Sequence, residues 1–144
     1  SIDDVEAIKE GLQDGTIDII ATDHAPHDIA DKQVEYQNAC FGIVGLETAL
    51  PLSLKLVDEK ILSMGDVIKK LTSTPADIFN LKAGSLSLDN EADILIFNPN
   101  LEYSIDISKF HSKSKNSPFD GWKVKGKVIH TLVKGKTAYS VNEI

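Results

Sequence analysis

Arginine is absent from this chain of 144 residues, and all 15 of its basic side chains are lysines. The 22 acidic side chains outnumber them, which leaves a formal net charge of −7 at pH 7. Nucleic-acid recognition usually requires a basic face, often with arginines that bind in a bidentate manner. We therefore expect no nucleic acid among the partners of this chain.

Cysteine is also scarce, since Cys40 is the single one. An internal disulfide and a cysteine-rich zinc site are both excluded, and a cytoplasmic location is the simplest expectation. No stretch of about 18 apolar residues occurs, as a membrane-spanning helix would require. No secretory signal pattern is visible either, so we expect neither a membrane span nor a membrane partner.

The length of the chain sets a further limit. A chain of this size can bury one hydrophobic core, but it is too short for a complete (β/α)8 barrel, which needs about 250 residues. The chain begins with Ser1, and its single methionine is Met64. We therefore expect this sequence to be a piece of a longer chain.

The first part of the sequence predicts helices around one buried strand. Apolar residues at helical spacing predict a helix over residues 2–12, which Asp14-Gly15 ends. The apolar run at residues 17–21 predicts a buried parallel strand. Residues 28–38 are polar and read as a surface loop. Later helices are predicted over 46–57, from Ser63 to 71, and in the stretch 75–81, with Pro75 at a first helical position.

From Gly84 onward the pattern changes to short β runs separated by turns. Strands are predicted over residues 86–88, 92–97, 128–133 and 137–141, and Lys134-Gly135-Lys136 reads as a hairpin turn. The polar residues 112–121 predict a long irregular stretch. We place a domain boundary near Lys82, which separates an α/β part at residues 1–82 from a mostly β part at residues 83–144.

The densest group of chemically useful side chains is Asp23, His24 and His27, directly after the predicted strand. Ligand sites in α/β folds lie at the carboxyl ends of the strands. A carboxylate there can ligate a divalent metal or act as a general base. It can equally be a loop residue that only accepts backbone hydrogen bonds. Because zinc sites need three or four ligands, these residues alone leave both interpretations open.

Several stretches taken together resemble the dihydroorotases of the amidohydrolase superfamily. They are Thr-Ile-Asp-Ile-Ile-Ala-Thr-Asp-His-Ala-Pro-His at residues 16–27, Phe-Gly-Ile-Val-Gly-Leu-Glu-Thr at 41–48 and Ser-Lys-Ser-Lys-Asn-Ser-Pro-Phe-Asp-Gly-Trp at 112–122. The β run that ends at residue 97 is similar to the β-sandwich segment of amidohydrolases. The resemblance covers nearly the whole chain in the same order.

This resemblance implies an α/β fold that is the C-terminal part of a metal-dependent (β/α)8 amidohydrolase barrel plus the C-terminal share of a β-sandwich. Residues 1–82 would belong to the barrel and residues 83–144 to the sandwich. Residues 17–21 would be the eighth barrel strand. The remaining metal ligands would lie before Ser1, so this chain would supply only part of the site.

The resemblance also implies a role for individual residues. Asp23 would ligate zinc, two ions being expected per complete site, and carry a proton between the attacking water and the ring nitrogen. His27 would contact the free carboxylate of the substrate, and the backbone of Phe41 and Gly42 would contact its pyrimidine ring. His24 belongs to the motif without an assigned role. Cys40 departs from the family, which often has proline there.

The implied activity is the reversible zinc-dependent cyclisation of N-carbamoyl-L-aspartate to L-dihydroorotate in pyrimidine biosynthesis. Two alternatives stay open: another cyclic amidohydrolase, such as a hydantoinase or allantoinase, and a non-catalytic dihydroorotase-like subunit that partners aspartate transcarbamoylase. The expected partners are the substrate, the N-terminal part of the same protein and a second copy in a homodimer. The isolated chain is expected to be inactive.

Three further residues have structural interpretations. Glu47 precedes a predicted helix, so we expect it to cap that helix or to interact favourably with its dipole. Phe119 and Trp122 are expected to pack the sandwich segment against the barrel segment rather than to bind substrate.

Overall fold

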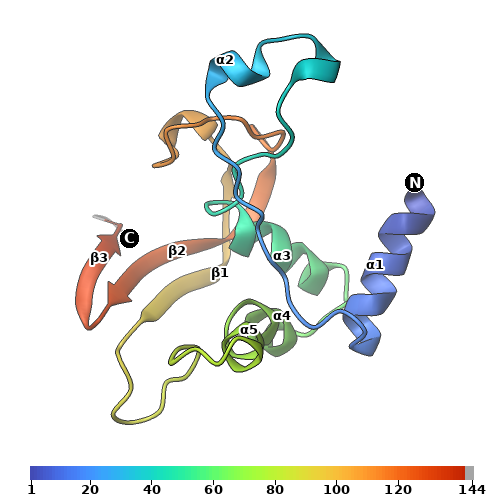
Figure 1. Cartoon of the computed structure of the whole chain (residues 1–144). Helices are drawn as coiled ribbons and strands as arrows, with labels where there is room; N and C mark the ends of the chain where they lie inside the picture. Colours follow the sequence, from blue (N-terminus) through green and yellow to red (C-terminus); the bar gives the residue numbers. More distant parts are fainter. Residues whose placement is uncertain (142–144) are drawn as a thin grey trace.

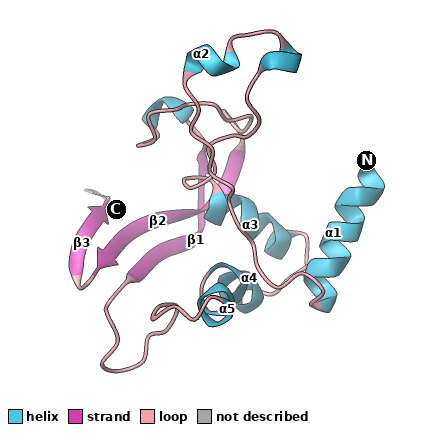
Figure 2. Ribbon diagram, in the orientation of Figure 1, coloured by secondary structure: helices cyan, strands magenta, loops and turns pink. Residues whose placement is uncertain are grey.

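The computed structural model describes residues 1–141, and it consists of helices followed by one antiparallel sheet (Figures 1 and 2). The α-helices are α1 (Ile2–Asp14), α2 (Ile29–Lys32), α3 (Ala49–Asp58), α4 (Met64–Leu71) and α5 (Ser73–Ile78), and the strands are β1 (Ile94–Ser104), β2 (Lys123–Val133) and β3 (Lys136–Ser140). Two short 3-10 helices span Tyr36–Asn38 and Ile107–Lys109. Within the described residues, no helix combines the length and apolarity needed to cross a membrane.

Local signals explain where the predicted helices begin and end. The Ser1 hydroxyl accepts the Asp4 N–H, and the Asp4 side chain reaches back to the Ser1 backbone, which forms a capping box for α1. Gly15 ends α1 in the left-handed conformation. The Ser63 hydroxyl accepts the Asp66 N–H at the start of α4, and its hydrogen bond to the Asp66 carboxylate holds the pKa of that group below its usual value.

The sheet has the strand order β1-β2-β3, and both strand pairs are antiparallel. Lys134 and Gly135 form the two-residue turn between β2 and β3, with positive φ angles of 50° and 73°. That combination fits the right-handed twist of a hairpin, so the predicted turn is confirmed. β1 and β2 are longer than predicted, and β3 begins one residue earlier. Residues 142–144, which complete the predicted β part, lie outside the described residues.

The main core forms where α3 and α4 pack beside the sheet. Leu12, Leu54, Leu62 and Val67 are buried together, and Phe97 of β1 packs against them. Trp122 makes an edge-to-face contact with Phe119 at 5.1 Å between ring centroids, and the Lys55 ammonium of α3 lies 4.7 Å from its ring. Trp122, although 44% exposed, therefore contacts α3 through Lys55, and its role in packing a sandwich against a barrel stays a prediction.

The strand predicted at residues 17–21 is wrong for the described chain, because no neighbouring strand offers it a hydrogen-bonded ladder. Its backbone bonds instead to the end of α4: the Ile20 N–H donates to the Lys70 carbonyl at 3.0 Å, and the Lys70 ammonium donates to the Ile17 carbonyl. Ile17 and Ile20 still pack against the core. In Figure 1 the segment leads from α1 past α3 to α2.

Three smaller predictions are also wrong. Residues 86–88 form no strand, since their leucines are exposed and no strand pairs with them. The loop predicted over residues 28–38 contains α2 and a short 3-10 helix. The Asp28 carboxylate caps the start of α2 by accepting the Ala30 N–H. Helix α5 begins at Ser73 rather than at Pro75, and it ends at Ile78 rather than at Leu81.

Candidate active-site segment

Asp23 occupies a tight bend at the point where the apolar segment reaches the surface. Its φ angle is +42°, a left-handed conformation that aspartate and asparagine tolerate better than most residues. The side chain is exposed, and its carboxylate forms no hydrogen bond or ion pair with any other described residue. Both carboxylate oxygens are therefore available to an external ligand.

His24 links this bend to the second conspicuous motif of the sequence. Its Nδ1 accepts the backbone N–H of Gly45 at 3.0 Å and that of Leu46 at 3.4 Å. Residues His24 and Ile43 form a parallel bridge, and the Ala25 N–H donates to the Ile43 carbonyl at 2.8 Å. Since Nδ1 is an acceptor here, it carries no proton. The His24 side chain therefore holds the bend against residues 43–46, a contact that the sequence motif did not indicate.

The loop that contains Phe41 and Gly42 lies against the His27 side of the bend. A Cβ atom at Gly42 would lie 2.5 Å from the Ala25 Cβ and 3.9 Å from His27 Nε2. The Gly42 carbonyl accepts the Lys32 ammonium at 2.7 Å and the Asn116 amide at 3.0 Å. Neither the Phe41 nor the Gly42 N–H donates to another described residue, so both remain available for a ligand. The Phe41 side chain is almost fully exposed.

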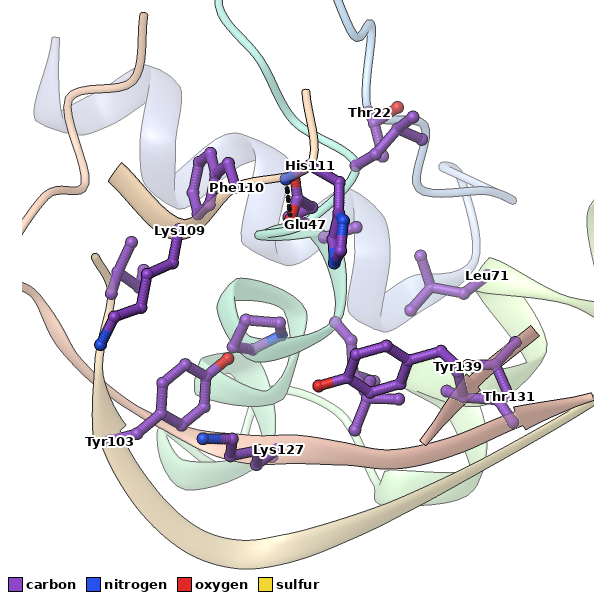
Figure 3. A pocket seen from close by; sticks show the side chains of 18 of the residues that line it. Thr22, Glu47, Leu71, Tyr103, Lys109, Phe110, His111, Lys127, Thr131 and Tyr139 are labelled. Atoms are coloured by element: carbon purple, nitrogen blue, oxygen red, sulfur yellow. Dashed lines mark hydrogen bonds between the residues drawn. The ribbon is translucent and has the colours of Figure 1, made fainter. Parts of the chain in front are cut away.

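One distant segment, residues 111–116, holds this loop and the residues after it at two points, and the sequence did not predict either contact. Asn116, besides donating to Gly42, accepts the Val44 N–H on its backbone carbonyl at 3.0 Å. The Glu47 carboxylate accepts the His111 N–H at 2.9 Å, which Figure 3 shows, and the Ser112 N–H at 3.1 Å. The predicted capping role of Glu47 is wrong, because Thr48 occupies the N-cap of α3 and the carboxylate bonds to residues 111–112 instead.

The contacts around Gly42 predict that Gly42→Ala displaces the loop and weakens substrate binding. Its φ angle of +101° is one that side chains rarely adopt, and the Ala25 Cβ has no freedom to move away from the new methyl group. We expect the Phe41–Gly42 backbone to shift and the KM for a substrate bound there to rise at least about tenfold. A tenfold change corresponds to about 1.4 kcal/mol of binding free energy. Steady-state kinetics measure this.

The matched control for that substitution is Gly15→Ala. Gly15 also has a positive φ, +86°, but nothing lies within 4 Å of an added Cβ. Gly15→Ala should lower stability without changing KM. Equal KM values for Gly42→Ala and the unmodified protein would contradict the proposed placement of the loop.

One cavity of the described chain is not lined by the candidate site residues. It has a volume of about 1060 Å³ and lies between the helices and the sheet (Figure 3). Its lining includes Thr22, Glu47, His111 and Tyr103 but not Asp23, His27, Phe41 or Gly42. Burial raises the pKa of the Tyr103 phenol, with a smaller contribution from Tyr139. The cavity thus adjoins the bend through Thr22, while the Asp23 carboxylate lies outside it.

Of the zinc ligands that the family resemblance implies, the chain contains one, the Asp23 carboxylate. Asp23 does not belong to any group of three metal-binding side chains within residues 1–141. A zinc site needs at least three protein ligands, so the described chain does not complete one around Asp23. An exposed carboxylate without other partners nevertheless fits the role of one ligand in a site that other residues complete.

The comparisons with known proteins agree on one family. The model of the amidohydrolase family matches residues 1–138. The chain is 49% identical over 139 residues to a dihydroorotase of Syntrophus aciditrophicus, which covers 96% of this chain and 33% of that protein. It is 53% identical over 134 residues to a dihydroorotase of a Wolbachia from Drosophila simulans, covering 93% of this chain and 30% of that protein. The chain thus spans about a third of the length of these relatives.

Solved structures of hydantoinases also match this chain over about a third of their own length. The L-hydantoinase of Arthrobacter aurescens matches with a TM-score of 0.86 and 33% identity, over 95% of this chain and 32% of that one. A D-hydantoinase matches with a TM-score of 0.88 at 21% identity, over 97% and 32% of the two chains, and this likeness concerns the fold alone. The mixed α/β fold is therefore that of a part of these hydantoinase structures, and the resemblance to dihydroorotases noted in the sequence is confirmed.

Proposed function

Because the chain belongs to the amidohydrolase family, we propose that it supplies one part of a dihydroorotase. The complete enzyme would interconvert N-carbamoyl-L-aspartate and L-dihydroorotate. The observation that carries this proposal is the identity of about half to dihydroorotases over nearly the whole chain. The Asp-His-Ala-Pro-His and Phe-Gly stretches that the sequence shares with that family also lie side by side, since Ala25 bonds to Ile43.

The same proposal divides the chain into two functional parts. Residues 1–82 would complete the C-terminal side of the barrel, and residues 83–144 would contribute to a β-sandwich. In support of a neighbouring segment that this chain lacks, α1 exposes a row of apolar side chains, Ile2, Val5 and Ile8. Apolar faces of this kind mark surfaces that bury against another segment. The remaining ligands of the metal site would come from outside these 144 residues.

When bound, zinc would supply an activated water and a polarised ring carbonyl. Asp23 would ligate the metal and act as the general base that takes the proton of the attacking water. The carboxylic acid would then return this proton to the leaving ring nitrogen, which general acid–base catalysis requires. Its exposed carboxylate, free of other described partners, supports this role. The His24 contacts to Gly45 and Leu46 would fix the bend that presents it.

Substrate binding would fall to the neighbouring residues. The ring of His27 would contact the free carboxylate of the substrate, and the N–H groups of Phe41 and Gly42 would contact the pyrimidine ring. Those N–H groups have no described acceptor, while the Gly42 carbonyl is held by Lys32 and Asn116. The Gly42 carbonyl therefore fixes the position of the loop, while the N–H groups of Phe41 and Gly42 are available to the substrate.

Two other functions compete with this proposal. A hydantoinase-type activity draws support from the structural match to the L-hydantoinase, although its identity of 33% is lower than that to the dihydroorotases. A non-catalytic subunit that partners aspartate transcarbamoylase would need no proton-transfer group, and the presence of Asp23 weighs against it. A homodimer of the complete protein also remains a proposal.

A substrate panel on the zinc-loaded protein tests the proposal. The protein must contain this chain together with the part that completes the metal site, and native mass spectrometry would count both components and the zinc. We expect kcat/KM for L-dihydroorotate to exceed that for hydantoin and allantoin at least about 100-fold, because a carboxylate-binding site discriminates against ligands without that group. Preference for hydantoin, or no turnover with zinc bound, would contradict it.

A further inference from the structure

Three metal-binding side chains of different kinds lie together beside the Phe41–Gly42 loop. The His27 imidazole, the Asp31 carboxylate and the Cys40 thiol each place a donor atom within 4.8 Å of the other two. No other group of three such side chains comes as close within residues 1–141. We propose that this cluster, to which Asp23 does not belong, binds a thiophilic divalent cation such as Zn²⁺ or Cd²⁺.

The distances are close to those of a tetrahedral metal site. Zinc bonds of about 2.0–2.3 Å to nitrogen, oxygen and sulfur separate neighbouring ligand atoms by roughly 3.3–3.8 Å. The three donor atoms would have to approach one another by about 1 Å from a separation of at most 4.8 Å. Asp31 and Cys40 are exposed, so rotation of their side chains can provide this movement. A water molecule would complete the coordination.

The backbone already holds the three residues near one another. The Cys40 N–H donates to the Asp31 carbonyl at 3.2 Å, and the Lys32 ammonium contacts the Cys40 carbonyl. Asp31 lies in α2, whose first turn is capped by Asp28. The His27 N–H donates to the Ala25 carbonyl at 3.0 Å. Metal binding would therefore need only side-chain adjustment, which keeps its entropic cost low.

The donor set also determines the kind of ion. Calcium and magnesium prefer oxygen ligands, whereas a thiolate together with an imidazole selects zinc and other thiophilic ions. The thiol would release its proton to solvent on binding, so that one thiolate and one carboxylate balance the two positive charges of the ion. His27 would bind through an unprotonated ring nitrogen.

A bound cation at this cluster would have a consequence for the substrate. If His27 contacts the substrate carboxylate, as the proposed function holds, the cation and the substrate would compete for the same imidazole. This consequence rests on the proposed function, while the metal site itself does not. Cadmium binding can therefore be measured without any substrate present.

The experiment is a titration of the protein with CdCl₂, followed through the ultraviolet absorption of the cadmium–thiolate bond. We expect a band in the unmodified protein that Cys40→Ser abolishes, and an affinity that falls at least about tenfold in Asp31→Asn. Glu35→Gln, which removes a carboxylate from the same loop outside the cluster, should bind cadmium as the unmodified protein does. Circular dichroism would verify that each variant is folded.

Two results would overturn the proposal. One is the absence of the cadmium–thiolate band from the unmodified protein, and the other is an equal loss of affinity in Asp31→Asn and Glu35→Gln, which would indicate general attraction to negative charge. Cadmium binding at Cys40 that leaves dihydroorotate turnover unchanged would still support the metal site. It would then count against the substrate role of His27.

Discussion

Replacing Asp23 with alanine should lower the turnover of L-dihydroorotate by the assembled enzyme at least about 1000-fold. General acid–base groups contribute about 10²- to 10⁴-fold to rates, and Asp23 would lose its contact with zinc as well. The fold should remain intact, because the Asp23 carboxylate bonds to no other described residue. Activity assays and circular dichroism on the same preparation would measure both effects.

Two variants sharpen this test. Asp23→Asn keeps a side chain that tolerates the φ angle of +42° but cannot accept the proton, so it should be as inactive as the alanine variant. Asp18→Asn removes another exposed carboxylate from the same segment and should leave turnover unchanged. Near-normal turnover in Asp23→Asn would contradict the assignment of Asp23 as the proton carrier.

The largest expected loss of stability comes from Gly126→Ala. Gly126 lies in β2 where the sheet meets α3, and an added Cβ would lie 2.1 Å from Leu54 Cδ1. Leu54 is a buried core residue, so it cannot move aside without disturbing its neighbours. The φ angle of +91° adds backbone strain. Together these effects should lower the free energy of unfolding by about 2–4 kcal/mol.

Gly121→Ala is the matched control for this substitution. Gly121 also has a positive φ, +74°, but nothing lies within 4 Å of an added Cβ. It should therefore show the backbone strain alone, about 1 kcal/mol. Urea unfolding of both variants measures the difference, which reports the contact with Leu54. Equal losses would mean that β2 and α3 do not approach as closely as described.

Features that depend on neighbouring residues could be predicted from the sequence. The helix over residues 2–12, the start of α4 at Ser63 and the turn at Lys134-Gly135 all follow from spacing, caps and turn preferences, and all are confirmed. The strand at residues 17–21 could not be settled in the same way. An apolar run specifies burial, but a strand also requires a partner, and here the end of α4 provides the hydrogen bonds instead.

The same distinction applies to the candidate site. The positions of Asp23, His27, Phe41 and Gly42 stood out from motifs within short stretches, and their roles remain proposals. The contacts that hold these stretches together could not be predicted, since Asn116 lies 74 residues from Gly42 and Ser112 lies 65 residues from Glu47. Cys40 could be recognised in the sequence because the family often has proline at this position. Its proximity to Asp31 could not be predicted, because it depends on the formation of α2.

The bonds from Asn116 to Gly42 and from Glu47 to residues 111–112 also determine when the site can form. During synthesis the chain emerges from its N-terminus, so the bend at Asp23 can bond to Ile43 and Gly45 early. The Phe41–Gly42 loop cannot reach its final position until residues 111–116 have been made. Because contacts between distant residues form slowly, this loop should be among the last parts of the molecule to become ordered.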